Sequence, residues 1–152
     1  IDLEGTETPG IERAYWSRHR EQLLEIRFRV FVHEQGVPPE MEEDQDDVQA
    51  LHLLVRDTRG EAIGCARLLD NGQIGRMAIL QGHRHRGVGS RLLQRLLEFA
   101  AHNGLPRVFL HAQCSAEGFY RKAGFVPVGE VFMEAGIPHR EMCLSLRPAG
   151  RA

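Results

Sequence analysis

The chain has 152 residues, of which 42% are hydrophobic and 26% are charged, and this size and composition are typical of one globular domain. A formal net charge of −2 at pH 7 argues against general attraction to nucleic acid or membranes, and no apolar run approaches the ~20 residues of a membrane span. Cys65, Cys114 and Cys143 are too few and too widely spaced for a disulfide framework, and the first residues lack a basic secretory start. We therefore expect a cytoplasmic domain over residues 1–152, with its core at about 11–147.

The first third of the chain is predicted to form a strand, a helix and an acidic loop. A short strand is expected around Ile11–Tyr15. The apolar residues Leu24, Phe28 and Phe31 are spaced by four and three positions, which predicts an amphipathic helix that ends before residue 36. The segment Glu40–Asp47 holds six acids in eight residues. Such a run is usually a solvated loop, although it could also attract a cationic acceptor.

The rest of the chain is predicted to form a sheet of mixed direction. In chain order the expected elements are strands Leu51–Arg56, Ala62–Leu69 and Ile74–Leu80, helix Val88–His102, strand Val108–Ala112, helix Ser115–Ala123, and strands Val126–Met133 and Met142–Leu146. The first three strands are expected to form an antiparallel meander, because turn residues such as Asn71-Gly72 join them. The strand after the long helix should run parallel to the one before it, since such crossovers are right-handed. The predicted class is α+β, with a mixed, mostly antiparallel sheet and flanking helices.

The residues before the long helix carry the most specific pattern in the chain. They read Arg-His-Arg-Gly-Val-Gly-Ser over positions 84–90, directly before the leucine stripe of the helix. Such a turn aims unpaired backbone N–H groups and the positive end of the helix dipole at one point, and its glycines let a ligand approach the backbone. The pattern predicts a site for phosphate or pyrophosphate. The alternative is a glycine-rich helix start with a basic first turn.

Three kinds of phosphate-binding loop share these features, and the flanking residues separate them. The nucleoside-triphosphatase loop needs a lysine after its last glycine, and no lysine follows Gly89. A dinucleotide-binding loop needs a third small residue at the position where this chain has Leu92. It also needs an acidic residue on a second strand about twenty positions later, where this chain is still in the expected helix or at its end. The remaining pattern, Arg84-x-x-Gly87-x-Gly89, resembles the pyrophosphate loop of the GNAT N-acetyltransferase superfamily.

Further segments extend this resemblance. The segment Ala116–Phe125 is similar to the second signature of the superfamily, a helix that carries a tyrosine and ends at Gly-Phe before a strand. Upstream, the pattern Arg-x-x-Val-Phe-Val-x-Glu-Gln of Arg27–Gln35, together with the acidic stretch and His52, is similar to the YjcF/ElaA-like branch of bacterial GNAT proteins. The segment Glu134–His139, read as a turn, fits the same branch. The resemblance spans roughly residues 20–146.

The resemblance implies the GNAT fold, in which two parallel central strands splay apart and coenzyme A lies in the gap. Acetyl-CoA is then the expected cosubstrate. The backbone of Met77, Ala78 and Ile79 would pair with its pantetheine arm as an added strand would. A bulge near Met77, as the family often shows, would turn an N–H group toward the thioester oxygen. The expected pyrophosphate loop consists of Arg84, His85, Arg86, Gly87, Val88, Gly89 and Ser90.

The catalytic residues that the resemblance implies are Tyr120 and Glu34. Tyr120 would protonate the leaving thiolate, because a phenol pKa of about 10 matches a thiolate pKa of about 8.5. The alternative is a ring that only packs under the cosubstrate. Glu34 would take the proton of the acceptor amine, or else form a salt bridge at the helix end. His52, His111 and His139 compete for the base role, each with a structural alternative, and His139 is expected close to the acceptor.

The expected function is transfer of an acetyl group from acetyl-CoA to a primary amine of a small molecule or peptide, by direct attack of the amine. The alternative is a non-catalytic acyl-CoA-binding or regulatory module, because a fold does not establish an activity. We expect no metal site, since no carboxylate or cysteine stands at ligand spacing from His83 and His85. We also expect no nucleic acid or membrane partner. The acceptor, the acyl chain length and the oligomeric state, a homodimer included, are left open.

Overall fold

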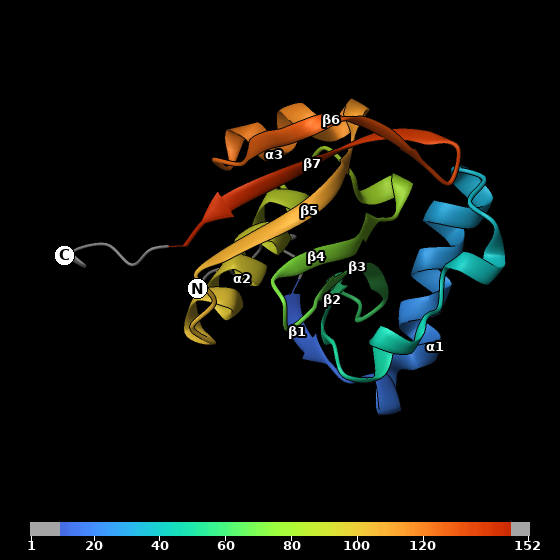
Figure 1. The fold of residues 1–152 in the computed structure, drawn as a ribbon. Helices are drawn as coiled ribbons and strands as arrows, with labels where there is room; N and C mark the ends of the chain where they lie inside the picture. The colour runs from blue at the N-terminus through green and yellow to red at the C-terminus, as the bar shows by residue number, and fades with distance from the viewer. Residues whose placement is uncertain (1–9, 147–152) are drawn as a thin grey trace.

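The computed structural model describes residues 10–146, in which helices flank a seven-stranded sheet (Figure 1). The strands are β1 (Gly10–Ala14), β2 (Leu51–Arg56), β3 (Ala62–Leu68), β4 (Gln73–Ile79), β5 (Arg107–Gln113), β6 (Val126–Glu134) and β7 (Ile137–Ser145). The α-helices are α1 (Trp16–Arg27), α2 (Val88–His102) and α3 (Glu117–Lys122), and a π-helical segment, Phe28–Glu34, continues α1. Short 3₁₀ turns lie at Pro39–Met41, Gln45–Val48, Gln81–His83 and Cys114–Ala116. Residue 147, the expected end of the core, lies outside the described residues.

The sheet has one parallel pair in the middle of otherwise antiparallel neighbours. Its strand order is β1-β2-β3-β4-β5-β7-β6, and only β4 and β5 run parallel. β2 to β4 form the predicted antiparallel meander, to which β1 adds a fourth strand, and β5, β7 and β6 form the second antiparallel part. Parallel neighbours need a long crossover, and α2 supplies it between β4 and β5. The mixed α+β architecture predicted from the sequence is confirmed.

Two hydrophobic clusters cover the two faces of this sheet. Alternate residues of β2 point to opposite faces, so Leu53 belongs to one cluster while Leu54 belongs to the other. The larger cluster takes the leucine stripe of α2, and the smaller one takes Leu23 and Ile26 of α1. The helices thus hold β3 and β4 from both sides (Figure 1). None of the helices in residues 10–146 is long and apolar enough to cross a membrane.

Two elements differ from the sequence-based expectation. The helix expected to run to residue 35 is an α-helix only to Arg27, and its last part winds as a π-helix. β7 begins at Ile137 instead of Met142. The reason is a two-residue turn at Ala135 and Gly136, whose φ values of +53° and +76° match the twist of a tight hairpin. His139, expected on a turn, therefore lies within β7.

The acidic segment Glu40–Asp47 is not the solvated loop that its composition predicts. Asp47 is completely buried, and Glu42 is 4% exposed. Arg27 and Arg67 donate hydrogen bonds to the Asp47 carboxylate at 3.1 and 2.9 Å. Buried charges are tolerated only when they are paired. These ion pairs dock the acidic segment against α1 and β3, where it forms part of the wall described below.

Candidate active site

A cleft opens in the sheet where β4 and β5 diverge. Within the described residues the two strands pair only at Gln73 with Phe109 and at Ile74 with Leu110. Beyond Ile74, β4 leaves β5, whereas β5 stays paired with β7 as far as Gln113. Such a gap leaves backbone N–H and C=O groups available to an extended ligand. The splayed parallel strands expected from the sequence are present.

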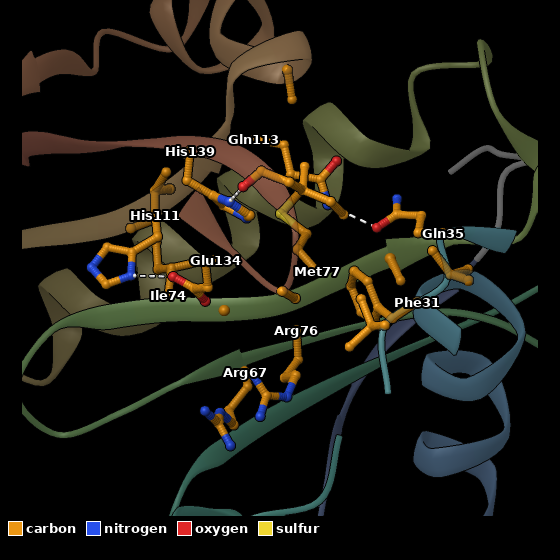
Figure 2. Close-up of a pocket in the computed structure, with 18 of the residues that line it drawn as sticks. Phe31, Gln35, Arg67, Ile74, Arg76, Met77, His111, Gln113, Glu134 and His139 are labelled. Carbon is orange, nitrogen blue, oxygen red and sulfur yellow. Dashed lines mark hydrogen bonds and ion pairs between the residues drawn. The ribbon is translucent and has the colours of Figure 1, made fainter. Parts of the chain in front are cut away.

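The cavity in this cleft has a volume of about 440 Å³, within the range of ligand sites, roughly 300–1,000 Å³ (Figure 2). Its walls come from the π-helical segment, the chain after it, β4, β5, α3 and the β6–β7 hairpin. The predicted site residues that line it are Met77, Ala78, Ile79, Arg84, Gly89, Tyr120 and His139. His85, Arg86, Gly87, Val88 and Ser90 belong to the adjoining loop and helix start. Glu34 is outside the cavity lining.

β4 carries a bulge beside the cleft. Its register against β3 slips by one residue, so that Arg76 and Met77 together oppose one residue of β3, Ala66. Arg76 has a φ of +51°, which lies in the left-handed region that residues other than glycine rarely adopt. A bulge of this kind re-aims backbone groups out of the ladder. The bulge expected near Met77 is confirmed.

The loop before α2 offers unpaired N–H groups to an anion. α2 begins at Val88 and has no side-chain cap, so its first-turn N–H groups lack that partner. His85 and Gly87 have φ values of +64° and +79°, and this backbone bends the loop around the helix end. A side chain added at Gly87 would meet no atom of residues 10–146 within 4 Å, and one at Gly89 would meet only the ring of Phe119. The backbone is therefore open to a ligand here, at the positive end of the helix dipole.

Arg84, the first residue of the loop motif, is held by the π-helical segment. Its Nη1 and Nη2 donate to the two carboxylate oxygens of Glu34 at 2.6 and 2.7 Å, and its Nε donates to the Ile79 carbonyl oxygen at 2.7 Å. Hydrogen bonds from Arg84 lower the pKa of Glu34. A carboxylate with both oxygens engaged and a low pKa is a poor proton acceptor. The geometry favours the salt-bridge role of Glu34 over the role of a base.

Tyr120 projects from α3 into the cleft. The rings of Phe119 and Phe125 lie edge-on to it, with centroids at 5.0 and 5.8 Å. Its hydroxyl lies 3.9 Å from the sulfur of Met77, which is only a weak acceptor. Burial raises the pKa of Tyr120 to about 12, so the phenol stays protonated at neutral pH. Among the described residues it is a proton donor without a strong partner, close to the bulge.

His139 reaches the cleft from β7 (Figure 2). Its Nδ1 lies 2.7 Å from the Ile137 carbonyl oxygen. Because a carbonyl can only accept, Nδ1 carries the proton in the neutral ring and Nε2 keeps its lone pair. The ring stacks on Phe132 at 5.9 Å, and the residue is 7% exposed. His139 thus offers a fixed hydrogen-bond acceptor in the cavity wall.

The other two histidines considered for the base role have different surroundings. His52 is completely buried, its Nε2 lies 2.8 Å from the Asp47 carbonyl oxygen, and its ring stacks on Trp16. Burial lowers its pKa. His111 lines the cavity with its Nδ1 at 3.3 Å from Glu134. No group of three or more potential metal ligands occurs in residues 10–146.

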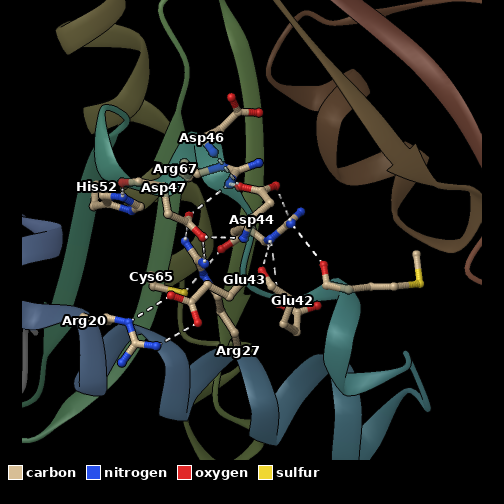
Figure 3. Close-up of polar contacts among 12 residues, drawn as sticks. Arg20, Arg27, Glu42, Glu43, Asp44, Asp46, Asp47, His52, Cys65 and Arg67 are labelled. Carbon is tan, nitrogen blue, oxygen red and sulfur yellow. Dashed lines mark hydrogen bonds and ion pairs between the residues drawn. The ribbon is translucent and has the colours of Figure 1, made fainter.

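Sequence reasoning missed two arginines and a glutamate in the cavity wall, Arg67, Arg76 and Glu42. Arg76 donates to Asp44 at 3.0 Å and to the Glu42 carbonyl oxygen at 3.1 Å, and Arg67 donates to Asp44 at 2.8 Å (Figure 3). These contacts join strands to the acidic segment across more than twenty positions of sequence. No local pattern signals such a pairing. The only available signal was the surplus of acids in a short segment, because acids can be buried only when cations pair with them.

Comparison with known proteins identifies relatives along most of the chain. Residues 16–146 match the family described as an acetyltransferase (GNAT) domain. The chain is 36% identical over 136 residues to the uncharacterized N-acetyltransferase YjcF of Bacillus subtilis, a match that covers 86% of this chain and 97% of YjcF. It is 34% identical over 125 residues to the protein ElaA of Escherichia coli, covering 77% of this chain and 81% of ElaA.

Solved structures agree with these matches. The crystal structure of E. coli ElaA has a TM-score of 0.80 at 32% identity, covering 88% of this chain and 98% of that chain. An acyl-CoA N-acyltransferase from Pseudomonas aeruginosa has a TM-score of 0.81 at 32% identity, covering 90% and 99%.

Proposed function

Because the chain belongs to the GNAT acetyltransferase family, in the branch of YjcF and ElaA, we propose that it transfers an acetyl group from acetyl-CoA to a primary amine. The family consists of acyltransferases that use acyl-CoA, and the acetyl donor and the amine acceptor are the proposed specificity. The observation that carries the proposal is the gap between β4 and β5, with the uncapped start of α2 beside it and Tyr120 projecting into it.

In the proposed complex the parts of acetyl-CoA would lie in order along the cleft. The first-turn N–H groups of α2, at Val88, Gly89 and Ser90, would bind the pyrophosphate. The backbone of β4 from Met77 to Ile79, which lacks a partner on β5, would pair with the pantetheine arm. The bulge at Arg76 and Met77 would then lie beside the thioester, with an N–H group aimed at its oxygen.

Two side chains would move protons in the transfer. Tyr120 would donate to the sulfur as the carbon–sulfur bond breaks. Its pKa of about 12 exceeds that of an alkyl thiolate in water, about 8.5, but the same dry cleft also raises the pKa of the departing thiolate. His139 would accept a hydrogen bond from the amine through Nε2 and take its proton as the carbon–nitrogen bond forms. Glu34 would act indirectly, by holding Arg84 at the start of the loop.

The test combines binding and turnover. Calorimetric titration with CoA is expected to show binding, and acetyl-CoA with a panel of primary amines and lysine-containing peptides is expected to release free thiol steadily with at least one acceptor. Binding without thiol release for every acceptor would contradict the proposal and favour a non-catalytic acyl-CoA-binding module. No heat on addition of CoA would contradict both.

A further inference from the structure

Two guanidinium groups stand in the cavity wall at the bulge, and neither is used by the proposed transfer chemistry. Arg76 is the bulge residue itself, and Arg67 lies on β3, paired in register with Gly75 of β4 (Figure 2). The side chain of Arg67 is 6% exposed and that of Arg76 is 22% exposed. A cavity lined by one buried and one half-buried cation favours an anionic ligand.

Both guanidinium groups have donors to spare. Arg67 uses Nη1 for Asp44 and Asp47, and none of its hydrogen bonds within residues 10–146 uses Nη2. Arg76 uses Nε for the Glu42 carbonyl oxygen and Nη2 for Asp44 and the Met41 carbonyl oxygen. None of its hydrogen bonds within the described range uses Nη1. A buried donor left unpaired is destabilising unless a ligand or water supplies the acceptor.

The carboxylates that pair with these arginines lie mostly outside the cavity lining. The cluster consists of Arg27, Arg67, Arg76, Glu42, Asp44 and Asp47 (Figure 3). Of its three acids only Glu42 lines the cavity. Asp44 accepts hydrogen bonds from both Arg67 and Arg76, and burial and then the charge of Arg67 lower the pKa of Arg76. An anion in the cavity would add a partner for the guanidinium nitrogens that Asp44 does not engage.

We propose that Arg67 and Arg76 bind a carboxylate of the acceptor, so that the acceptor is an amino acid rather than a simple amine. This inference rests on the proposed function and names its substrate class. Nη1 of Arg76 is left to donate a charge-assisted hydrogen bond to a carboxylate, which makes Arg76 suited to orient such a substrate. Arg76 directly precedes Met77, beside which the thioester would lie. The guanidinium group is therefore about the length of one arginine side chain away from the proposed position of the thioester. An amino acid whose carboxylate binds the guanidinium group and whose length matches this distance would place its amine at the thioester.

The experiment compares acceptors that differ only in the carboxylate. The pairs are glycine with methylamine, β-alanine with ethylamine, γ-aminobutyrate with n-propylamine, and 5-aminovalerate with n-butylamine. For at least one pair, kcat/KM of the wild type is expected to be about tenfold or more higher for the amino acid, the effect of one charge-assisted pair. Equal use of both members of every pair would overturn the proposal.

Variants of Arg76 then assign the preference to this side chain. Arg76→Gln is expected to lower the ratio of kcat/KM for the preferred amino acid to kcat/KM for the matched amine at least about tenfold. Arg76→Lys keeps the charge and is expected to keep part of the preference. The matched control is Arg95→Gln, which removes an exposed arginine that pairs with Glu98 on α2. An equal loss for both acceptors in Arg76→Gln would overturn the proposal.

Two further measurements separate the outcomes. Calorimetric titration of the protein–CoA complex with the same amino acids needs no turnover, and Arg76→Gln is expected to weaken that binding while the affinity for CoA stays unchanged. Absence of thiol release with intact CoA binding contradicts the proposed function, whereas absence of amino acid binding contradicts the carboxylate subsite. If Arg76→Gln does not fold in thermal unfolding, Arg76→Lys decides the question, since an unchanged preference in that variant would contradict the proposal.

Discussion

At the scale of single residues, the pKa values of two side chains near the cleft are set by their surroundings: burial for Tyr120 and one arginine for Glu34. Tyr120 is surrounded by aromatic rings and is held in its neutral form. Glu34 has the opposite environment, because a single arginine engages both of its oxygens and holds it ionised. The sequence predicted a proton-transfer role for both Tyr120 and Glu34. Their surroundings favour that role for Tyr120 and a salt-bridge role for Glu34.

Replacing Tyr120 by Phe should lower kcat about a hundredfold and leave the affinity for acetyl-CoA nearly unchanged, because only the donated proton is lost while the ring still packs. Initial rates of thiol release at saturating acetyl-CoA measure this effect. With a pKa of about 12 in the wild type, ionisation of Tyr120 should not reduce turnover between about pH 6 and 9. Unchanged kcat in Tyr120→Phe would remove the acid role.

Glu34→Gln distinguishes the salt-bridge role from a base role. We expect a loss of CoA affinity of less than about tenfold, because a partly exposed pair contributes about 1 kcal/mol or less. The turnover of bound acetyl-CoA should persist, since Glu34 is outside the cavity lining. Glu25→Gln, at an exposed position of α1, is the control. A collapse of kcat with intact CoA binding would instead restore Glu34 as the base.

At the scale of elements, the cleft depends on two connections with unusual local structure. The loop before α2 needs left-handed backbone at Gly87, and the acidic segment before β2 needs buried ion pairs to stay against the sheet. Each connection supplies one wall of the site. A change in either should affect ligand binding or stability without altering the central strands.

Gly87→Ala should weaken CoA binding about tenfold, because an L side chain costs roughly 1–2 kcal/mol at a φ of +79° and the loop would shift. Titration calorimetry with CoA measures the change. Gly82→Ala is the matched control, since Gly82 has neither a positive φ nor a neighbour within 4 Å of an added side chain among the described residues. Equal CoA affinities in the two variants would contradict a requirement for left-handed backbone at Gly87.

Asp47→Asn should destabilise the protein by about 3–5 kcal/mol, because Arg27 would be left buried without its charge partner and Arg67 would keep only Asp44. Chemical denaturation measures the free energy of unfolding. Asp46→Asn, which changes an exposed acid one position away, should have little effect. A loss below about 1 kcal/mol in Asp47→Asn would show that the ion pairs do not hold the acidic segment in place.

At the scale of the whole molecule, stability and the site share the same buried polar groups. His52 lies between the acidic segment and α1, and burial lowers its pKa. A histidine with a lowered folded-state pKa binds a proton more readily in the unfolded chain. Its contribution to stability is therefore present above its ordinary pKa of about 6.5 and is lost as the pH falls below that value. Glu42, with a raised pKa, acts in the opposite direction at acid pH.

The stability advantage of the wild type over His52→Gln should accordingly shrink as the pH is lowered from about 7.5 to 5. Urea unfolding of both proteins at several pH values measures this difference, and the comparison cancels the contribution of Glu42 because both proteins retain it. His102→Gln, at an exposed position of α2, should show no such trend. An advantage that stays constant across the range would mean that His52 is not buried in its neutral form.

The sequence by itself determined the elements whose signal is local. The leucine stripe of α2, the glycine and arginine loop before it and the alternating strands of the meander depend on neighbours a few positions away, so their patterns are visible in the chain. The same holds for the GNAT loop motif and for Tyr120 beside its Gly-Phe helix end. The last two strands were expected as an antiparallel pair, which β6 and β7 form, but the start of β7 at Ile137 was missed because Ala135-Gly136 is an uncommon pair for a hairpin turn.

Only the tertiary structure decided which charges meet. Arg84 forms an ion pair with Glu34, which lies fifty positions earlier in the chain. Arg67 on β3 and Arg76 on β4 donate hydrogen bonds to Asp44 of the acidic segment. The energy of these contacts comes from burial and from the distance between charges, and neither quantity is encoded by spacing along the chain. For that reason the glutamate expected to act as a base is paired with Arg84 of the loop, and two arginines with no sequence signal line the cavity.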